Sequence, residues 1–350
     1  MRTIDQLENL EGKKVLLRAD FDVPVVNGSI SEPFRVKRQK ESLRYLLDRG
    51  ARVTMAAHIS AVPSFEPLVP QLEKILGVDI QFENGDGPVV LRENLRADPG
   101  EESNNEAFAQ KLVAGCDIYV NNAFAVCHRE HASVVTAPLM IPAYAGLLVK
   151  EETEALSQFI DAPAQGKVVF IAGAKASTKA PIVRHIIGKA HRVVVGGVLA
   201  NDIYKVLGRD IGSSQVDENA EELLAGLDLH DPRLVIPTDA IIDNGQMVDI
   251  GPQTTAAFTA LATGAKLIFW NGPMGRFEDA RFMAGTQALA RAITSSGALS
   301  IVGGGDTISA VDSLGLLDKF KFVSTGGGAM LAFLAGTQLP GLRVLGYYHD

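Results

Sequence analysis

Glycine-rich turns that follow apolar runs are the first feature of this sequence that could do chemistry. The runs Gly303–Thr307 (GGGDT) and Gly326–Gly328 (GGG) each separate an apolar stretch from a helical one, and shorter versions occur at Gly173 and at Gly196-Gly197. Backbone N–H groups at strand-to-helix turns of this kind bind phosphate oxygens. A single copy is usually only a tight turn, but several copies in one half of the chain favour a nucleotide phosphate site. Neither a P-loop nor a G-x-G-x-x-G fingerprint is present.

Charged side chains accompany these glycines. Lys175 and Lys179 are four residues apart at one of the turns, where they could neutralise phosphate groups. Asp306 directly follows three glycines, where it could hold Mg²⁺ through water or phosphate oxygens, although an aspartate at such a place also commonly caps a helix. Glu278 is a candidate for binding ribose hydroxyls, but an isolated glutamate is more often simply solvated.

The first half of the chain places arginine and histidine near the ends of its apolar runs. Ligands of parallel sheets bind beyond the carboxyl ends of the strands, and arginine there suits a phosphorylated, multiply anionic small molecule. Each arginine could instead pair with an acidic side chain at the surface. Because arginine or histidine recurs at several strand ends, surface ion pairs explain the whole set less well than an anion-binding site does. The residues are Arg18, Asp20, Arg35, His58, Arg96, His128, Arg129 and His131.

The elements that must position these groups alternate between short apolar runs and longer amphipathic stretches. This alternation predicts an α/β fold with parallel sheets flanked by helices. Strands are expected at Lys14–Arg18, Arg52–Ala57, Val89–Leu91, Asp117–Val120, Lys167–Ala172, Arg192–Val195, Leu234–Pro237, Lys266–Trp270, Leu299–Val302 and Phe322–Ser324. Helices are expected at Val36–Arg49, Val69–Leu76, Asn105–Ala114, Ala180–Ala190, Ala200–Leu207, Ile308–Leu314 and Met330–Leu334.

Length and composition limit the classes of protein to consider. A chain of 350 residues favours two domains, and the amphipathic stretch 150–165 is the expected interdomain helix and hinge. The net charge of −8 argues against general nucleic-acid binding, and no apolar run is long enough for a membrane span. Two cysteines, Cys116 and Cys127, form no disulfide framework, and the N-terminus has no apolar signal core. We therefore expect a soluble cytoplasmic protein.

Taken together, the motifs resemble those of phosphoglycerate kinases over nearly the whole chain and in the family's order. The runs WNGPMGRFE (270–278), IVGGGDT (301–307) and VSTGGGA (323–329) match the family pattern almost letter for letter. Further similar runs are RADFDVP (18–24), LRENLRADPGEE (91–102), NNAFAVCHREHAS (121–133), AGAKASTK (172–179) and DIGPQT (249–254).

The resemblance implies two Rossmann-like lobes joined by a hinge helix. Residues 1–149 would form the lobe that binds 3-phosphoglycerate, and residues 166–338 the lobe that binds MgADP or MgATP. Residues 339–350 would return to the N-terminal lobe. The implied reaction is direct, reversible phosphoryl transfer between 1,3-bisphosphoglycerate and MgADP, with Mg²⁺ as cofactor, in glycolysis or gluconeogenesis. The family is usually monomeric.

The same resemblance implies roles for individual residues. Lys175 would neutralise the transferred phosphoryl group, Lys179 would hold nucleotide phosphate and Asp306 would hold Mg²⁺. Arg35 would bridge the acceptor carboxylate and the transferring group. Glu278 would hold the ribose, and Thr307 would cap its helix. The nucleotide would be cradled by the glycines of the turns, Gly196, Gly197, Gly272, Gly303, Gly304, Gly305, Gly327 and Gly328, of which Gly304 and Gly327 would also be catalytic. In the acceptor site, the 3-phosphate would be held by Arg96 and Arg129, and the site would be lined by Asp20, Asp22 and His58.

The departures from the family pattern concentrate in the acceptor half. The loop Ala57–Pro63 lacks the family's phosphate-binding arginine, with Ala61 or Val62 in its place, and Asp22 replaces an asparagine. Smaller departures are Asn122, Ala125, Thr178 and the shortened Gly196-Gly197-Val198 turn. Three interpretations therefore stay open: a compact phosphoglycerate kinase, a related kinase with another acceptor, or a non-catalytic nucleotide-binding relative.

Overall fold

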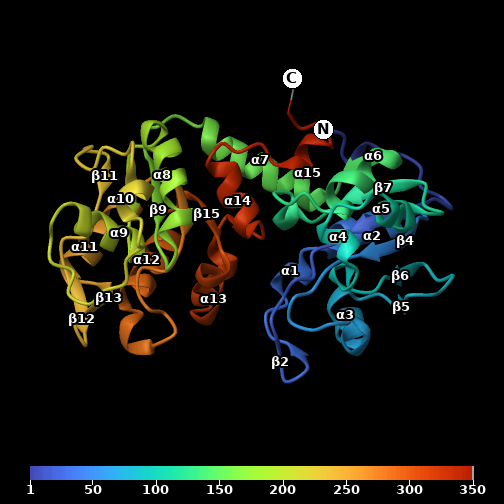
Figure 1. Ribbon diagram of the computed structural model, residues 1–350, viewed down its shortest axis with the longest axis horizontal. Coiled ribbons are helices and arrows are strands. Elements are labelled where there is room, and N and C mark those ends of the chain that lie inside the picture. Colours follow the sequence, from blue (N-terminus) through green and yellow to red (C-terminus); the bar gives the residue numbers. More distant parts are fainter. Residues whose placement is uncertain (349–350) are drawn as a thin grey trace. The chain divides into compact units, whose positions relative to one another are not determined.

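The computed structural model describes residues 1–348, which divide into two compact units. The first unit contains residues 1–154 together with residues 338–348, and the second contains Ala155–Thr337. Each unit is built on a six-stranded parallel sheet with helices packed against it (Figure 1). None of the helices among residues 1–348 is long and apolar enough to cross a membrane. The predicted α/β class, with one parallel sheet in each half, is confirmed.

In the first unit the sheet has the strand order β5-β6-β4-β1-β7-β8. Alternate residues of β1 enter different cores: Val15 and Leu17 pack on one face, and Leu16 packs on the other. A strand buried on both faces explains the continuous apolar run. The strands are β1 (Lys14–Arg18), β4 (Arg52–Ala56), β5 (Gln81–Phe82), β6 (Val89–Leu91), β7 (Ile118–Asn121) and β8 (Ala143–Ala145), with a hairpin of β2 (Val25–Val26) and β3 (Ser29–Ile30). The helices are α1 (Phe34–Lys37), α2 (Lys40–Leu47), α3 (Val69–Leu76), α4 (Pro99–Glu102), α5 (Glu106–Val113), α6 (Ala137–Met140) and α15 (Pro340–Arg343).

In the second unit the strand order is β11-β10-β9-β14-β15-β16. The chain adds strands outward from β9 on one side and then, from β14, outward on the other, so the order reverses between β9 and β14. Ligands of such sheets bind at the reversal, beyond the carboxyl ends of the strands. The strands are β9 (Lys167–Ile171), β10 (Arg192–Val195), β11 (Leu234–Val235), β14 (Leu267–Asn271), β15 (Leu299–Gly303) and β16 (Phe322–Ser324), with an antiparallel hairpin of β12 (Ala240–Asp243) and β13 (Gln246–Ile250). The helices are α8 (Ala180–Ile186), α9 (Gly197–Val206), α10 (Ala220–Leu224), α11 (Pro252–Thr263), α12 (Ala284–Ser295), α13 (Gly305–Ser313) and α14 (Gly327–Leu334).

Several predicted elements need correction. The expected helix 36–49 is broken into α1 and α2 at Arg38–Gln39, where the buried Gln39 side chain donates to the Arg35 carbonyl and accepts from Asn122. Helices α9, α13 and α14 begin at glycines, three residues earlier than expected. The short strands β5 and β8 and both hairpins were not predicted, because most of their residues are exposed or half-buried and they lack the continuous apolar run of the predicted strands.

The segment that leaves the first unit is helix α7 (Leu147–Asp161), which starts three residues before the predicted hinge segment 150–165. Its first turn is anchored by Asn122, whose side-chain oxygen accepts from the Leu148 amide at 3.1 Å and from the Ser42 hydroxyl at 2.6 Å. Residues 338–348 pack within the first unit, where the Gly341 amide donates to the Cys127 carbonyl at 2.9 Å. The last two residues of the predicted returning segment 339–350 lie outside the described residues. The N-terminal ammonium donates to the Gly346 carbonyl at 2.6 Å.

A buried polar cluster fixes the carboxyl end of β1. Arg18 and Glu101 are 1% and 0% exposed, and their closest charged atoms are 3.8 Å apart. Ser133 joins them, because its hydroxyl accepts from Arg18 Nε at 2.8 Å and donates to Glu101 at 2.5 Å. Arg18 is therefore a structural residue that holds α4 and the segment after β7 against β1.

Removing Glu101 should leave the Arg18 guanidinium buried and unpaired. We expect Glu101→Ala to lower the free energy of unfolding by about 3–5 kcal/mol, measured by urea denaturation. Glu101→Gln keeps the size and one acceptor oxygen but loses the charge, so it should cost stability, though less than alanine. Glu41→Ala, at an exposed position of α2, should cost under about 0.5 kcal/mol. A glutamine variant as stable as the wild type would contradict the role assigned to the charge pair, because glutamine keeps the size of Glu101 but not its charge.

Candidate nucleotide and acceptor sites

The loops after β9, β10 and β14 approach one another through backbone alone. The Ala172 amide donates to the Asn271 carbonyl at 2.8 Å, and the Val198 amide donates to the Gly173 carbonyl at 3.0 Å. Gly272 has φ +95°, and a Cβ there would overlap the Ala172 carbonyl. A Cβ at Gly197, which has φ +57°, would likewise overlap Gly173. Only glycine permits both the backbone conformation and this closeness.

Asn271, at the end of β14, connects the turns that carry the charged groups. Its side chain is buried; the amide nitrogen donates to the Gly303 carbonyl at 2.6 Å, and the amide oxygen accepts from the Lys179 ammonium. The next residue, Gly272, donates its amide to the Thr307 hydroxyl at 2.7 Å. These bonds join the segments after β9, β14 and β15 into one cradle.

The predicted capping role of Thr307 is wrong in this structure. Helix α13 has Gly304 as its N-cap, with φ +101°, and no side chain makes the cap hydrogen bond. Thr307 is instead buried and its hydroxyl holds the Gly272 amide. Asp306 does not cap this helix either, so the alternative to its predicted metal-binding role is not observed. It is an exposed residue of the first turn of α13.

The charges gathered at this cradle act on one another. Burial lowers the pKa of Lys179 to about 8; Asp306 acts in the opposite direction and Lys175 in the same direction as burial. Lys175 itself is exposed. Two lysines and one aspartate thus meet at the glycine turns, as a triphosphate with a bound divalent cation would require.

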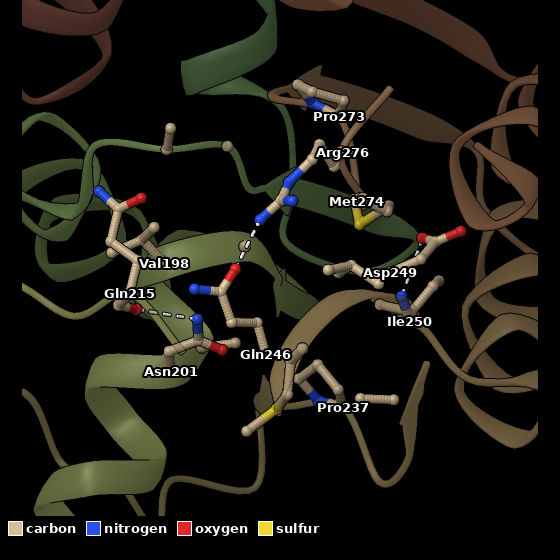
Figure 2. A pocket seen from close by; sticks show the side chains of 18 of the residues that line it. Val198, Asn201, Gln215, Pro237, Gln246, Asp249, Ile250, Pro273, Met274 and Arg276 are labelled. Carbon is tan, nitrogen blue, oxygen red and sulfur yellow. Dashed lines mark hydrogen bonds between the residues drawn. The ribbon is translucent and has the colours of Figure 1, made fainter. Parts of the chain in front are cut away.

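A cavity of about 380 Å³ opens beside these turns (Figure 2). Its walls are largely apolar, with Val198, Pro237 and Met247 among the lining residues, and Gly197, Glu278 and Asp306 line it as well. The size and the few polar groups suit a nucleoside. Polar side chains form the rest: Arg276 donates to Gln246 at 2.9 Å, and Asn201 donates to the Gln215 carbonyl at 2.9 Å (Figure 2).

The predicted nucleotide residues are therefore brought together to different degrees. Gly197, Glu278 and Asp306 line the cavity. Lys179, Gly272, Gly303 and Thr307 meet through Asn271 and its neighbour, Gly304 and Gly305 begin α13, and Gly196 donates its amide to the end of β9 at 2.9 Å. Gly327 begins α14 after β16 and does not line the cavity.

The sequence analysis missed much of the cavity wall. Hairpin β12–β13 contributes Gln246 to Ile250, and the residues Asn201, Gln215 and Arg276 were not singled out. Part of the signal was present, because the motif DIGPQT (249–254) begins in the last two residues of the hairpin's second strand. Nothing in the local pattern indicates that a two-stranded hairpin outside the main sheet forms a wall.

In the first unit, the His58 ring faces the Asp22 carboxylate in a defined orientation. Arg18 can only donate, so the His58 Nδ1 that lies 3.2 Å from it must accept, and His58 Nε2 carries the hydrogen that faces Asp22 at 3.4 Å. Burial lowers the pKa of His58, which is consistent with a neutral ring. Burial alone would raise the pKa of Asp22, but the bonds from His58 and from the Ser60 amide at 2.8 Å hold it well below its usual range.

The predicted acceptor arginines differ in their surroundings. Arg35 lies 3.9 Å from the buried Asp20 and donates to the Asp22 carbonyl at 3.2 Å. Arg96 donates to the Ser60 hydroxyl at 3.0 Å and pairs with Glu102 at 3.2 Å. Arg129 is exposed, and its guanidinium has no hydrogen-bond or ion-pair partner within residues 1–348. Two of the three arginines are thus oriented by neighbouring side chains.

Metal binding by protein groups alone finds no support in this structure. Residues 1–348 contain no cluster of three or more histidine, cysteine, aspartate or glutamate side chains that could hold an ion. Mg²⁺ often takes only one or two carboxylates and completes its shell with phosphates and water. The single exposed carboxylate of Asp306 fits an ion that arrives with a nucleotide.

The comparisons with known proteins agree with this geometry. The family model described as phosphoglycerate kinase matches residues 4–337. Proteins named phosphoglycerate kinase from Rubrobacter xylanophilus and Dictyoglomus turgidum are 38% and 36% identical, covering 98% and 97% of this chain and 98% and 96% of theirs. The phosphoglycerate kinase structure from Coxiella burnetii is 33% identical over 97% of this chain and 98% of its own, with a TM-score of 0.84. That from Pyrococcus horikoshii is 28% identical over 99% of both, with a TM-score of 0.88. A match of this extent, on a sheet whose reversal point carries the paired lysines and the glycine cradle, places the chain in the phosphoglycerate kinase family.

Proposed function

We propose that this chain transfers a phosphoryl group reversibly between 1,3-bisphosphoglycerate and MgADP, giving 3-phosphoglycerate and MgATP. The observation that carries the proposal is the joining of Lys179, Gly303 and Gly272 around Asn271, beside a nucleoside-sized cavity lined by Asp306 and Glu278. Phosphoglycerate kinases are phosphotransferases, so the family of this chain supports the same reaction.

The nucleotide half of the proposal follows from the charges at the cradle. The base and ribose would occupy the cavity, with Glu278 accepting from ribose hydroxyls. Lys179 would bind phosphate near the base of the cradle, and the exposed Lys175 would follow the transferring group. Asp306 would hold the Mg²⁺ that the nucleotide brings, and that ion would neutralise phosphate charge.

The acceptor half rests on the arginines of the first unit. Arg35 would orient the carboxylate of the acceptor, and Arg96 and Arg129 would bind its phosphate. The acceptor carboxylate is itself the nucleophile toward the γ-phosphorus of MgATP, so no covalent enzyme intermediate and no general base are needed. Positioning and charge neutralisation supply most of the rate in such transfers. Closing of a hinge near α7, a cytoplasmic location and a monomeric state belong to the same proposal.

A second candidate acceptor class is favoured by two observations. The carboxylate of Asp22 carries a negative charge beside His58, which is neutral and so does not compensate it. The loop 59–63 supplies no arginine. Both features suit an acceptor with less negative charge than 3-phosphoglycerate.

The decisive assay supplies 3-phosphoglycerate and MgATP and reports 1,3-bisphosphoglycerate through its NADH-dependent dehydrogenase. Turnover that requires 3-phosphoglycerate, and that Arg35→Ala reduces, supports the proposal. Nucleotide binding without turnover on 3-phosphoglycerate or on other phosphorylated acids would identify a non-catalytic relative instead.

Lys175→Ala should lower kcat far more than it weakens MgADP binding. The charge that Lys175 neutralises is greatest in the transition state, so we expect a loss of roughly 100-fold or more in kcat. Steady-state kinetics and calorimetry measure the two effects separately. Lys321→Ala, at an exposed position of the same unit, is the matched control. An unchanged kcat would assign Lys175 a structural role only.

Binding of MgADP should take up a proton between about pH 8 and pH 9. Lys179 has its pKa lowered to about 8 in the free protein and should regain the proton beside phosphate. Calorimetry in buffers of different ionisation enthalpy measures this uptake. Lys179→Arg keeps the charge at every pH and should abolish it. Uptake that persists in the arginine variant would show that another group titrates.

Asp22→Asn should lower the KM for 3-phosphoglycerate and leave MgADP binding unchanged. A like charge about 8 Å from the acceptor costs about 2 kcal/mol at an effective dielectric constant near 20, so a drop of roughly tenfold or more is expected. The asparagine oxygen can still accept from His58. An unchanged or higher KM, measured by the coupled assay, would favour the second acceptor class.

A further inference from the structure

A short strap, defined here as residues 213–217, connects two walls of the cavity. On one side, the Ser213 amide donates to the Gly245 carbonyl at 2.8 Å, and the Ser214 hydroxyl accepts from the Met247 amide at 2.9 Å. These bonds attach the strap to hairpin β12–β13, which carries Gln246 and Met247 into the cavity wall.

On its other side the strap is attached to helix α9. Asn201 donates to the Gln215 carbonyl at 2.9 Å, and the Asp217 amide donates to Asp202 Oδ1 at 2.8 Å. Asn201 and Gln215 both line the cavity (Figure 2). Helix α9 begins at Gly197, so the same helix supplies one of the phosphate turns. The strap therefore sets the separation of the hairpin from α9.

The α9 attachment contains two facing carboxyl groups. Asp202 is 0% exposed, and its Oδ2, like the buried Oδ2 of Asp217, has no hydrogen-bond partner within residues 1–348. The bond from the Asp217 amide to Asp202 Oδ1 brings the two carboxyl groups near each other. A hydrogen bond between them requires that one carry a proton, since ionised carboxylates only accept. Leaving two buried carboxylate oxygens unpaired would be costly.

We propose that Asp202 and Asp217 share one proton, and that this carboxyl–carboxylate bond closes the strap on α9 so that nucleotide binding in the cavity depends on pH. Both are positioning residues, because they act through Gln215 and the hairpin and do not touch the nucleotide. The inference rests on the proposed function only for the identity of the ligand.

The surroundings of the pair agree with a shared proton. Burial raises the pKa of Asp202 to about 6, and the charge and side-chain bond of Asp217 add to the rise. Two groups lower the pKa of Asp202: the Asp217 amide, which donates to it, and the charge of Lys205 on α9. From α10, which packs on α9, Glu221 and Glu222 are exposed. No third carboxylate or histidine within residues 1–348 completes a cation site here.

The first arm of the test measures stability without nucleotide. The folded protein holds a proton that the unfolded chain releases near pH 4, so stability falls as the pH rises from about 4 to about 6. Between pH 5 and pH 7.5 the folding equilibrium constant should fall roughly tenfold from this pair. Asp202→Asn supplies a donor and an acceptor at every pH, so its stability relative to the wild type should rise across this range. Glu218→Gln, exposed and adjacent to Asp217, is the control and should follow the wild type.

The second arm measures the dissociation constant of MgADP at pH 5.5 and pH 7.5. Titration of the nucleotide phosphates and of Lys179 is common to all variants, so it cancels in the ratio of wild type to variant. At pH 5.5 the dissociation constants of the wild type and Asp202→Asn should be nearly equal. At pH 7.5, where the wild-type pair has lost its proton, the variant should bind MgADP at least threefold more tightly. Asp217→Asn serves as the second variant if Asp202→Asn does not fold.

Each result decides one part of the proposal. A stability profile of Asp202→Asn parallel to that of the wild type overturns the shared proton. A changed stability profile with an unchanged MgADP ratio overturns the coupling of the strap to the cavity. Stabilisation of the wild type, but not of Asp202→Asn, by Ca²⁺ or Mg²⁺ alone at pH 7.5 identifies a cation site instead. Failure of the wild type to bind MgADP at either pH overturns the proposed function, while the first arm still decides the carboxyl pair.

Discussion

The side-chain amide of Asn271 is the contact on which the nucleotide half of this structure depends. An amide can donate and accept at once, and Asn271 uses both functions, toward the Gly303 carbonyl and the Lys179 ammonium. Its carbonyl also receives the Ala172 amide, so one residue at the end of β14 holds the turns after β9 and β15. The reversal of strand order between β9 and β14 is what places that residue at the centre. Neither an aspartate nor a hydrophobic residue could satisfy both partners.

The acceptor half uses a comparable arrangement built around a charge. Arg18 is buried at the end of β1 and directs His58, and His58 in turn directs Asp22. Because Arg18 fixes the tautomer of His58, the buried Arg18 side chain also determines which atom of His58 faces the Asp22 carboxylate. This chain of donors attaches residues 58–60 to Asp22, and it explains why the negative charge of Asp22 faces a neutral partner.

The sequence allowed prediction of the features that local chemistry controls. All six strands of the second sheet were predicted because each is a short apolar run followed by glycine or a polar turn, and the lysines, Asp306 and Glu278 were predicted from their places after those strands. Thr307 was misassigned because a threonine after GGGD has the pattern of a cap, whereas its hydroxyl is engaged by Gly272 across the crevice. The strap and the Asp202–Asp217 pair could not be predicted, since 15 residues separate the two aspartates and only tertiary packing brings them together.

The central claim is that the phosphoryl group of ATP passes directly to a carboxylate of a small phosphorylated acid. Incubation of the protein with [γ-³²P]ATP, Mg²⁺ and 3-phosphoglycerate, followed by hydroxylamine trapping, shows where the label goes. The account predicts label in a hydroxylamine-sensitive acyl phosphate, formed only when 3-phosphoglycerate and Mg²⁺ are both present. Hydroxylamine converts that acyl phosphate into a hydroxamate and releases the label as inorganic phosphate, so the products are compared before and after it is added. Label found on the protein, or label released as inorganic phosphate before hydroxylamine is added, would contradict the claim.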